Sequence, residues 1–209
     1  MTGGPKHDMN KTRKGGLSFY HKEKKITNEK IAHAFGYLFW AVLAVILSYV
    51  LVWAVGIKTS MIGSSMEPEL YNGQEVLIDR FLYNFIRPGR GDVIVFRPNG
   101  NENAHLYIKR VVGIPGDTIQ IKNGVLILNG VEQPLLFADR IEEAGTASEV
   151  ITIPEDEYFV MGDNCNNSED SRSVNLGNVR IDTIYGKAWF HMAAENSGLG
   201  TIGKVYFNE

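Results

Sequence analysis

The feature that most constrains the fold is a long segment without a charged side chain near the N-terminus. It covers the 23 residues from Ala34 to Gly56. A helix rises about 1.5 Å per residue, so a helix of this length would cover roughly 35 Å, enough to cross the hydrocarbon core of a bilayer. A cleavable signal peptide ending near Gly56 is the alternative, but its apolar region would be only about 7 to 15 residues long. The length favours a retained membrane anchor at residues 34–57.

Charge differs strongly between the two sides of this segment. The chain of 209 residues has a formal net charge of -3, but residues 1–33 hold eight Lys and Arg against three Asp and Glu, and the rest holds 13 against 21. A basic tail can bind nucleic acid, or it can mark the cytoplasmic end of a membrane span. The adjoining apolar segment favours the second interpretation. We therefore expect residues 1–33 in the cytoplasm, residues 58–209 across the membrane, and no nucleic-acid partner.

The part after the anchor, roughly 150 residues, is long enough to form one domain with a core. It consists of short apolar stretches separated by turn signals. Strands are expected at residues 75–81, 92–96, 105–112, 118–122, 125–128, 157–161 and 185–190. Asn-Gly pairs at 123–124 and 129–130 predict tight hairpin turns. The pattern predicts an all-β domain of coiled antiparallel sheets, preceded by a single transmembrane α-helix, with an irregular insertion near residues 136–150.

Cysteine and histidine usage limits the chemistry. The chain has one cysteine and five histidines. One cysteine cannot form an intramolecular disulfide, and we interpret Cys165 as an incidental loop residue. No metal-ligand spacing is visible among these six residues, so we expect neither a metal nor another cofactor.

Two side chains suggest hydrolytic chemistry. Ser65 lies in the run Gly-Ser-Ser-Met-Glu-Pro at residues 63–68, and Lys109 follows the apolar run at residues 106–108. A serine hydroxyl is a poor nucleophile near neutral pH and needs a base beside it. A lysine can be that base only if burial removes its charge. Taken singly, Ser65 could be a turn residue and Lys109 an exposed strand residue, so the pair needs support from elsewhere in the chain.

A serine, histidine and aspartate arrangement is a second way to activate the serine. It would have to use His105 or His191 as the base and Asp92 or Asp163 as its partner. Neither histidine has a convincing motif around it. This alternative is therefore disfavoured.

Five stretches in a fixed order resemble the type I signal (leader) peptidase family. They are residues 34–56, Ser64–Pro68, Arg90–Phe96, Tyr107–Asp117 and Gly162–Arg172. Each stretch alone is weak evidence for the family, whereas the order and spacing of all five together are strong evidence. The resemblance implies a membrane-bound serine endopeptidase that removes N-terminal signal peptides from exported preproteins with a serine/lysine dyad and no cofactor.

The resemblance also assigns roles by motif position. Ser65 falls on the family's nucleophile and Lys109 on its general base. Oxyanion and site support is implied for Gly63, Ser64, Ser168, Asp163, Asp170 and Arg172. Substrate binding in shallow apolar pockets, which suit small residues one and three places before the cut, is implied for Met66, Leu70, Tyr107 and Ile108.

The resemblance implies specific hydrogen bonds and ion pairs for the support residues. Gly63 falls where some members carry a serine whose hydroxyl assists the oxyanion hole, so here the backbone amides of Ser65 and Ser64 are expected to supply the donors. The position of Ser168 is implied to hydrogen-bond the catalytic lysine. The charged support residues are implied to hold the site through ion pairs.

The chain departs from the family pattern in three places. Glu69 stands where threonine is usual. Cys165 and Asn166 stand where arginine and aspartate are usual. The path from Arg172 to Gly177 is about two residues longer than the common arrangement. The resemblance therefore assigns no local hydrogen-bond or ion-pair partners at these positions.

Partners and location follow from the same resemblance. We expect exported preproteins as substrates, with the lipid bilayer and the protein translocation machinery as further partners. The expected location is the plasma membrane, with one span, a cytoplasmic N-terminus and an extracytoplasmic catalytic domain. Alternatives are a peptidase dedicated to one substrate such as a pilin or conjugation protein, or an inactive anchored β-domain that binds exported polypeptides. A self-cleaving repressor is disfavoured because no DNA-binding helical domain is evident.

Overall fold

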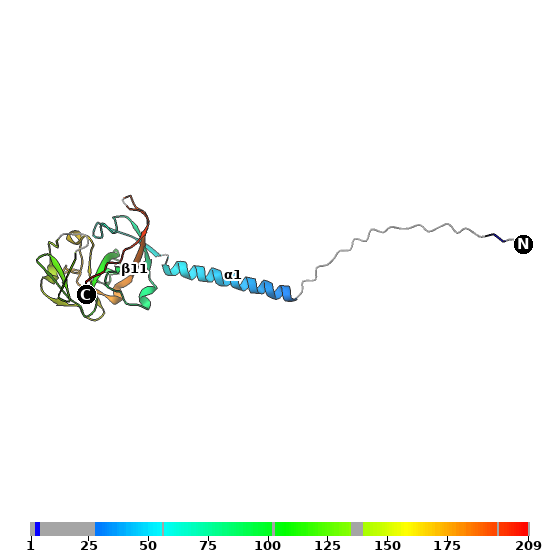
Figure 1. The fold of residues 1–209 in the computed structure, drawn as a ribbon, viewed down its shortest axis with the longest axis horizontal. Coiled ribbons are helices and arrows are strands. Elements are labelled where there is room, and N and C mark those ends of the chain that lie inside the picture. The colour runs from blue at the N-terminus through cyan, green and yellow to red at the C-terminus, as the bar shows by residue number, and fades with distance from the viewer. Residues whose placement is uncertain are drawn as a thin grey trace. The chain divides into compact units, whose positions relative to one another are not determined.

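The computed structural model describes residues 3–4, 28–55, 57–101, 103–134, 140–195 and 197–208. Within them, one long helix comes first in the chain and short strands follow (Figure 1). The helix and the strand-rich domain are described separately.

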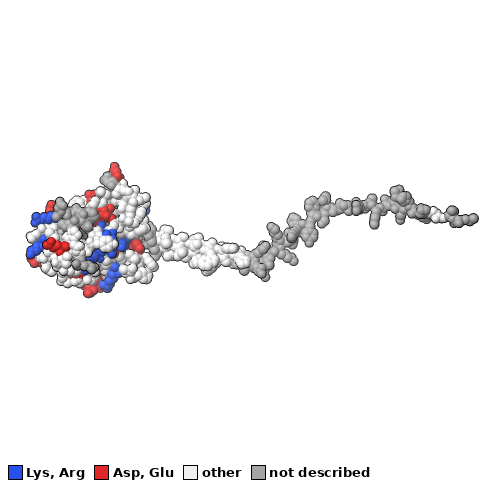
Figure 2. Space-filling view, viewed as in Figure 1, with Lys and Arg blue, Asp and Glu red and all other residues white. Residues whose placement is uncertain are grey.

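The helix α1 (Asn28–Val55) is almost entirely apolar. Its stretch from His33 to Val52 has a mean hydropathy of 2.3, and none of that stretch is buried. No blue or red side chain appears on its described surface in Figure 2. By length and composition α1 can cross a membrane. The described helix ends at Val55, and Ile57, the last residue of the predicted anchor, lies in the first strand.

The larger sheet has eight strands, and every neighbouring pair is antiparallel. Its order is β1 (Ile57–Ser60), β2 (Glu75–Asp79), β11 (Ile184–His191), β3 (Val93–Phe96), β4 (Tyr107–Gly113), β9 (Glu157–Met161) and β10 (Val179–Arg180), with β12 (Gly200–Thr201) paired to β11. Register shifts interrupt β11 twice and β4 once. Such bulges bend a sheet, so they let it coil.

The smaller sheet has four strands in the order β7 (Val131–Gln133), β6 (Val125–Leu128), β5 (Thr118–Lys122) and β8 (Ile151–Thr152). Its two turns use the predicted Asn-Gly pairs. Asn123 and Gly124 have φ angles of 53° and 78°, and Asn129 and Gly130 have 51° and 81°. Positive φ at both central residues is what a tight hairpin requires, so both predicted turns are confirmed.

The fold class is all-β, as the sequence predicts, with α1 as the apolar N-terminal helix. The predicted strands are present within a few residues, and β1, β7, β8, β10 and β12 are additional. Of the predicted insertion, residues 136–139 lie outside the described part of the chain. The rest is irregular apart from one 3-10 turn, Gly145–Ser148.

Two clusters of buried apolar side chains stabilise the sheets and the turn that position the site. One joins the sheets, because Ile119 and Leu126 of the smaller sheet pack with Val112 and Phe159 of the larger one. The second lies in the larger sheet and includes the fully buried Met66. Burial of such side chains contributes about 1.5 to 3 kcal/mol each.

The C-terminal segment, residues 202–208, runs from the larger sheet to the smaller one. The Ile202 amide donates to the Trp189 carbonyl in β11. Asn208 exchanges two hydrogen bonds with the Gln133 side chain in β7, at 2.6 and 3.0 Å. This segment therefore links the two sheets.

Candidate active site

Ser65 lies in the loop that follows β1, just before a helical turn. Gly63 has a φ of +82°, which few residues other than glycine adopt. Beyond Ser65, the Leu70 amide donates to the Met66 carbonyl at 2.8 Å, and both of these side chains are fully buried. The buried side chains of Met66 and Leu70 fix the turn, and Ser65 remains partly exposed at its start.

Lys109 is brought to Ser65 from 44 residues further along the chain. It lies in β4 opposite Ile94 of β3, and only 5% of its surface is exposed. Its Nζ atom lies 2.5 Å from the Ser65 Oγ atom. The structure therefore brings the predicted nucleophile and the predicted base within hydrogen-bond distance.

The environment of Lys109 favours the neutral amine. Burial lowers its pKa from 10.5 to about 8, against the opposing effects of Asp170, Glu169 and Asp163. Near pH 7 about a tenth of the molecules then carry the free amine. Lys109 can accept a proton at neutral pH and does so better in mild alkali.

Two buried ion pairs flank this strand and the loop opposite it. Arg110 holds Asp163 through two hydrogen bonds of 2.7 and 2.6 Å. Arg172 holds Asp170 through two hydrogen bonds of 2.8 Å. Each carboxylate is thus matched by a guanidinium in the bidentate geometry that gives strong pairing.

Ser168 lies close to the dyad but makes no bond to it. Its Oγ atom is buried without a hydrogen-bond partner among the described residues. A Cβ atom at Gly162 would overlap both Ser168 Oγ and the Ser65 carbonyl oxygen. Gly162 is therefore needed for the close approach of these two segments, although the sequence analysis gave it no role. The implied bond from Ser168 to the lysine is not formed in this structure.

Side-chain amides hold the nucleophile loop in place. The backbone N–H of Asn164 donates to the Ser65 carbonyl at 3.0 Å, and its side-chain amide donates to the Ser64 carbonyl at 3.2 Å. Asn167 donates to the Ser64 hydroxyl at 2.6 Å. Neither asparagine had an expected role from the sequence. Their position inside the Gly162–Arg172 motif is the signal that could have found them.

The backbone amides near Ser65 are not equivalent. The Gly63 amide donates to the Asn72 side chain at 2.9 Å, so it is occupied. No described residue accepts a hydrogen bond from the amide of Ser65 or Ser64. An oxyanion hole needs such free donors beside the nucleophile. Asn72 had not been singled out from the sequence.

A cavity of about 310 Å³ opens beside the dyad. It is lined by Met61, Ile62, Ser65, His105, Leu106, Tyr107, Ile108, Lys109 and Glu169. Tyr107 and Ile108 are thus where the sequence placed them. Met66 and Leu70 are not on this wall, because the helical turn after Ser65 points both side chains into the core beneath it. Glu169 lines the cavity and was not expected there.

The departures from the family pattern have local partners. Glu69 accepts a hydrogen bond from the Gly203 amide at 2.5 Å, which ties the nucleophile turn to the C-terminal segment. Cys165 is buried, and Arg172 donates to its carbonyl. Asn166 bonds to the Glu142 amide at 3.0 Å. These contacts replace the usual charged pair with bonds to the insertion and to the backbone.

The histidine alternative finds no support in the hydrogen bonds. His191 Nδ1 lies 2.8 Å from the Gln74 side chain. The Asp92 carboxylate accepts from Lys187 at 2.7 Å, and Asp163 is held by Arg110 as described above. Both candidate aspartates therefore face cations instead of a histidine.

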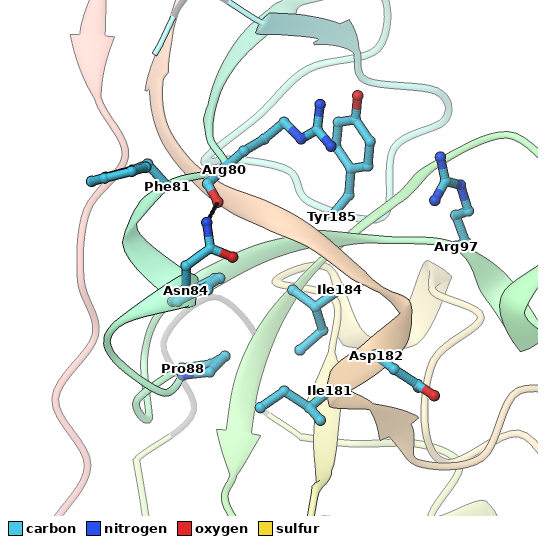
Figure 3. A pocket seen from close by; sticks show the side chains of 10 residues that line it. Arg80, Phe81, Asn84, Pro88, Arg97, Ile181, Asp182, Ile184 and Tyr185 are labelled. Atoms are coloured by element: carbon cyan, nitrogen blue, oxygen red, sulfur yellow. Dashed lines mark hydrogen bonds between the residues drawn. The ribbon is translucent and has the colours of Figure 1, made fainter. Parts of the chain in front are cut away.

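A separate cavity of about 360 Å³ is lined by residues that follow β2 and β3 and by the start of β11 (Figure 3). The guanidinium carbon of Arg80 lies 4.3 Å from the centre of the Tyr185 ring, and that of Arg97 lies 5.2 Å from it. None of the predicted site residues lines this cavity. It is therefore distinct from the cavity at the dyad.

Comparison with known proteins supports one family. Residues 34–193 match the family model described as signal peptidase, peptidase S26. The chain is 32% identical over 177 residues to signal peptidase I of Bacillus licheniformis, which covers 80% of this chain and 92% of that one. It is 32% identical over 182 residues to signal peptidase I T of Bacillus subtilis, which covers 81% and 93%.

A crystal structure of a signal peptidase I from Enterococcus faecalis is 31% identical and covers 49% of this chain and 97% of that chain, with a TM-score of 0.38. The family model spans well over half of the chain, and the Bacillus relatives are covered over nearly their full length. The chain belongs to the signal peptidase family, peptidase S26.

Proposed function

We propose that this signal peptidase cleaves signal peptides from preproteins with Ser65 as the nucleophile and Lys109 as the general base. The observation that carries the proposal is the 2.5 Å separation between Lys109 Nζ and Ser65 Oγ, combined with the burial that lowers the lysine pKa to about 8. A serine peptidase of this family needs such a base because an unassisted hydroxyl reacts poorly.

The reaction follows from these positions. Neutral Lys109 takes the Ser65 proton while the Oγ atom attacks the carbonyl carbon of the scissile bond. The oxyanion that forms accepts a hydrogen bond from the Ser65 amide, with the Ser64 amide as a second candidate donor. The Lys109 ammonium then protonates the leaving amine. The regenerated amine activates a water, which releases the acyl group from Ser65.

The substrate would bind as an extended strand along the start of β4. Pairing of β4 with β9 begins only at Arg110, so residues 106–109 present an edge that β9 does not cover. An extended peptide can add to such an edge through its backbone. The walls formed by Tyr107 and Ile108 then limit the size of the substrate side chains, which favours small ones.

We place this domain across the membrane from a basic N-terminal tail. Residues 1–33 would form the cytoplasmic tail, residues 34–57 the anchor, and residues 58–209 the extracytoplasmic catalytic domain in the plasma membrane. The excess of lysine and arginine before α1 supports this orientation. The lipid bilayer and the translocation machinery would then be partners, because the substrate's own apolar segment lies in the same bilayer.

The test is processing of a model preprotein by the full chain in lipid vesicles. Ser65→Ala and Lys109→Ala should each abolish processing while the protein stays folded, as judged by circular dichroism and thermal melting. Normal processing by the Lys109→Ala variant would exclude lysine as the base. A serine-acylating inhibitor should label Ser65, whereas a binding module without activity would remain unlabelled.

A further inference from the structure

The cavity beside the dyad has one acidic side chain, Glu169, among apolar walls. Met61, Ile62, Leu106 and Ile108 are among the apolar residues that line it. The Tyr107 hydroxyl lies 3.4 Å from Glu169 Oε2 and donates to it. Glu169 is exposed, so its carboxylate is at the open side of the cavity.

Glu169 forms no ion pair with the described residues. Its neighbour in the chain, Asp170, is paired with Arg172, and Asp163 is paired with Arg110. Among the described residues no lysine, arginine or histidine comes within ion-pair distance of Glu169. The open side of the cavity therefore presents a carboxylate without an ion-pair partner, while the amine of Lys109 is buried deeper in the same cavity.

The position of a bound peptide decides which of its residues meets this charge. Successive side chains of an extended strand point to opposite sides. If the first and third residues before the cut point into the apolar cavity, the second points to its open side. A lysine or arginine can lay its aliphatic stem along an apolar wall while its charged end reaches a carboxylate.

We propose that Glu169 selects substrates with a lysine or arginine as the second residue before the scissile bond. The proposal rests on the proposed cleavage by Ser65 and Lys109, and it adds a charge preference to the preference for small side chains. The interaction is an exposed ion pair, so it is worth about a two- to five-fold gain in kcat/KM at low salt. It acts mainly on KM, because the substrate charge is at a distance from the reacting atoms.

The test uses two peptide substrates that differ only in lysine or glutamine at this position. The full chain is assayed in vesicles of uncharged lipid, so that lipid charge does not contribute. The native protein should prefer the lysine peptide, Glu169→Gln should show a ratio near one, and Glu169→Asp should keep part of the preference. Raising the salt to about 0.5 M should shrink the native preference, because screening weakens exposed ion pairs.

The matched control is Glu132→Gln, which removes the same charge from an exposed position in β7 of the smaller sheet. It should keep the native ratio. A native ratio near one, or an unchanged ratio in Glu169→Gln, would overturn the role of Glu169 while leaving cleavage intact. If the native protein cut neither peptide, the proposed cleavage would fail together with this preference.

Discussion

Arg110, the residue next to Lys109, forms a buried bidentate ion pair with Asp163. The side chains of Arg110 and Asp163 are each 3% exposed. Neighbouring residues of a strand point to opposite faces, so Lys109 reaches Ser65 while Arg110 fixes the Gly162–Arg172 loop from the other face. Arg110 also donates to the Gly203 carbonyl at 2.7 Å. One side chain thus joins β4, this loop and the C-terminal segment.

Replacement of Arg110 by methionine should destabilise the domain strongly. The change leaves the Asp163 carboxylate buried without its partner, which costs about 3 to 5 kcal/mol in the free energy of unfolding. Denaturation of the detergent-solubilised chain, followed by tryptophan fluorescence, measures the loss. The control is Arg180→Met, which breaks the exposed pair with Asp182 and should leave the free energy of unfolding nearly unchanged, because exposed ion pairs contribute little. Equal losses in the two variants would contradict the structural role of the buried pair.

Local sequence signals were sufficient for most of the fold. The Asn-Gly turns could be predicted because positive φ angles select those residues. The strands β3 and β9 could be predicted because their apolar runs are bounded by turn residues. The pairing of Lys109 with Ser65 could be predicted because serine chemistry demands a base and the family motifs supply one. The turns and strands are encoded by short stretches of sequence, whereas the pairing of Lys109 with Ser65 needed the joint order of several motifs.

Other features depend on contacts that no local pattern reveals. Met66 was expected beside the substrate, but the turn that follows Ser65 directs it into the core. The motif at residues 162–172 marks Asn164 and Asn167 as lying near the site, but their bonds to the nucleophile loop depend on the fold. The short strand β12 pairs through only two residues, and such brief pairing leaves almost no periodicity to detect.

Substitution of Gly91 by alanine should loosen the C-terminal segment. A Cβ atom at Gly91 would overlap the carbonyl oxygen of Val205, and its φ is +83°. Gly130 is a matched control because its φ is +81° and a Cβ atom there would meet nothing within 4 Å. Both variants bear the backbone strain of about 1 to 2 kcal/mol, but only Gly91→Ala adds the steric clash.

Protease digestion of the two glycine variants separates these effects. Cleavage within residues 202–208 should be faster in Gly91→Ala than in Gly130→Ala, and the unfolding free energy of Gly91→Ala should be lower by more than backbone strain explains. If the two variants behaved alike, the contact between Gly91 and Val205 would not be what holds the segment.

Replacement of Lys109 by methionine should stabilise the protein while it removes activity. The pKa of Lys109 is lowered from 10.5 to about 8 in the folded state, so the unfolded chain binds more protons between these pH values. Stability therefore rises with pH across this window, and the full cost of the buried amine, about 3 kcal/mol, is present below pH 8. Lys109→Met should be more stable than the native protein at pH 7, and the difference should shrink above pH 8. A constant difference from pH 7 to 10 would contradict this.

The rate of cleavage should follow the titration of Lys109. Only the neutral amine can accept the Ser65 proton, so kcat/KM should fall about tenfold per pH unit below an apparent pKa near 8 and level off above it. Burial sets this value, while Asp170, Glu169 and Asp163 raise the pKa and Arg172 lowers it. Glu169→Gln removes one acidic charge, which should lower the Lys109 pKa. The acidic limb, meaning the part of the profile in which kcat/KM falls as the pH falls, should therefore move to lower pH.

The exposed Glu169 is the acidic group to change, because Asp170 and Asp163 belong to ion pairs whose loss would disturb the fold. A glutamine peptide serves as substrate, so that the charge preference for lysine does not enter the comparison. Glu132→Gln should leave the limb in place, because screening at ordinary salt suppresses an exposed charge in the other sheet. A limb that stayed fixed in Glu169→Gln, or a flat profile from pH 6 to 10 in the native protein, would show that Lys109 is not the group whose deprotonation limits the reaction.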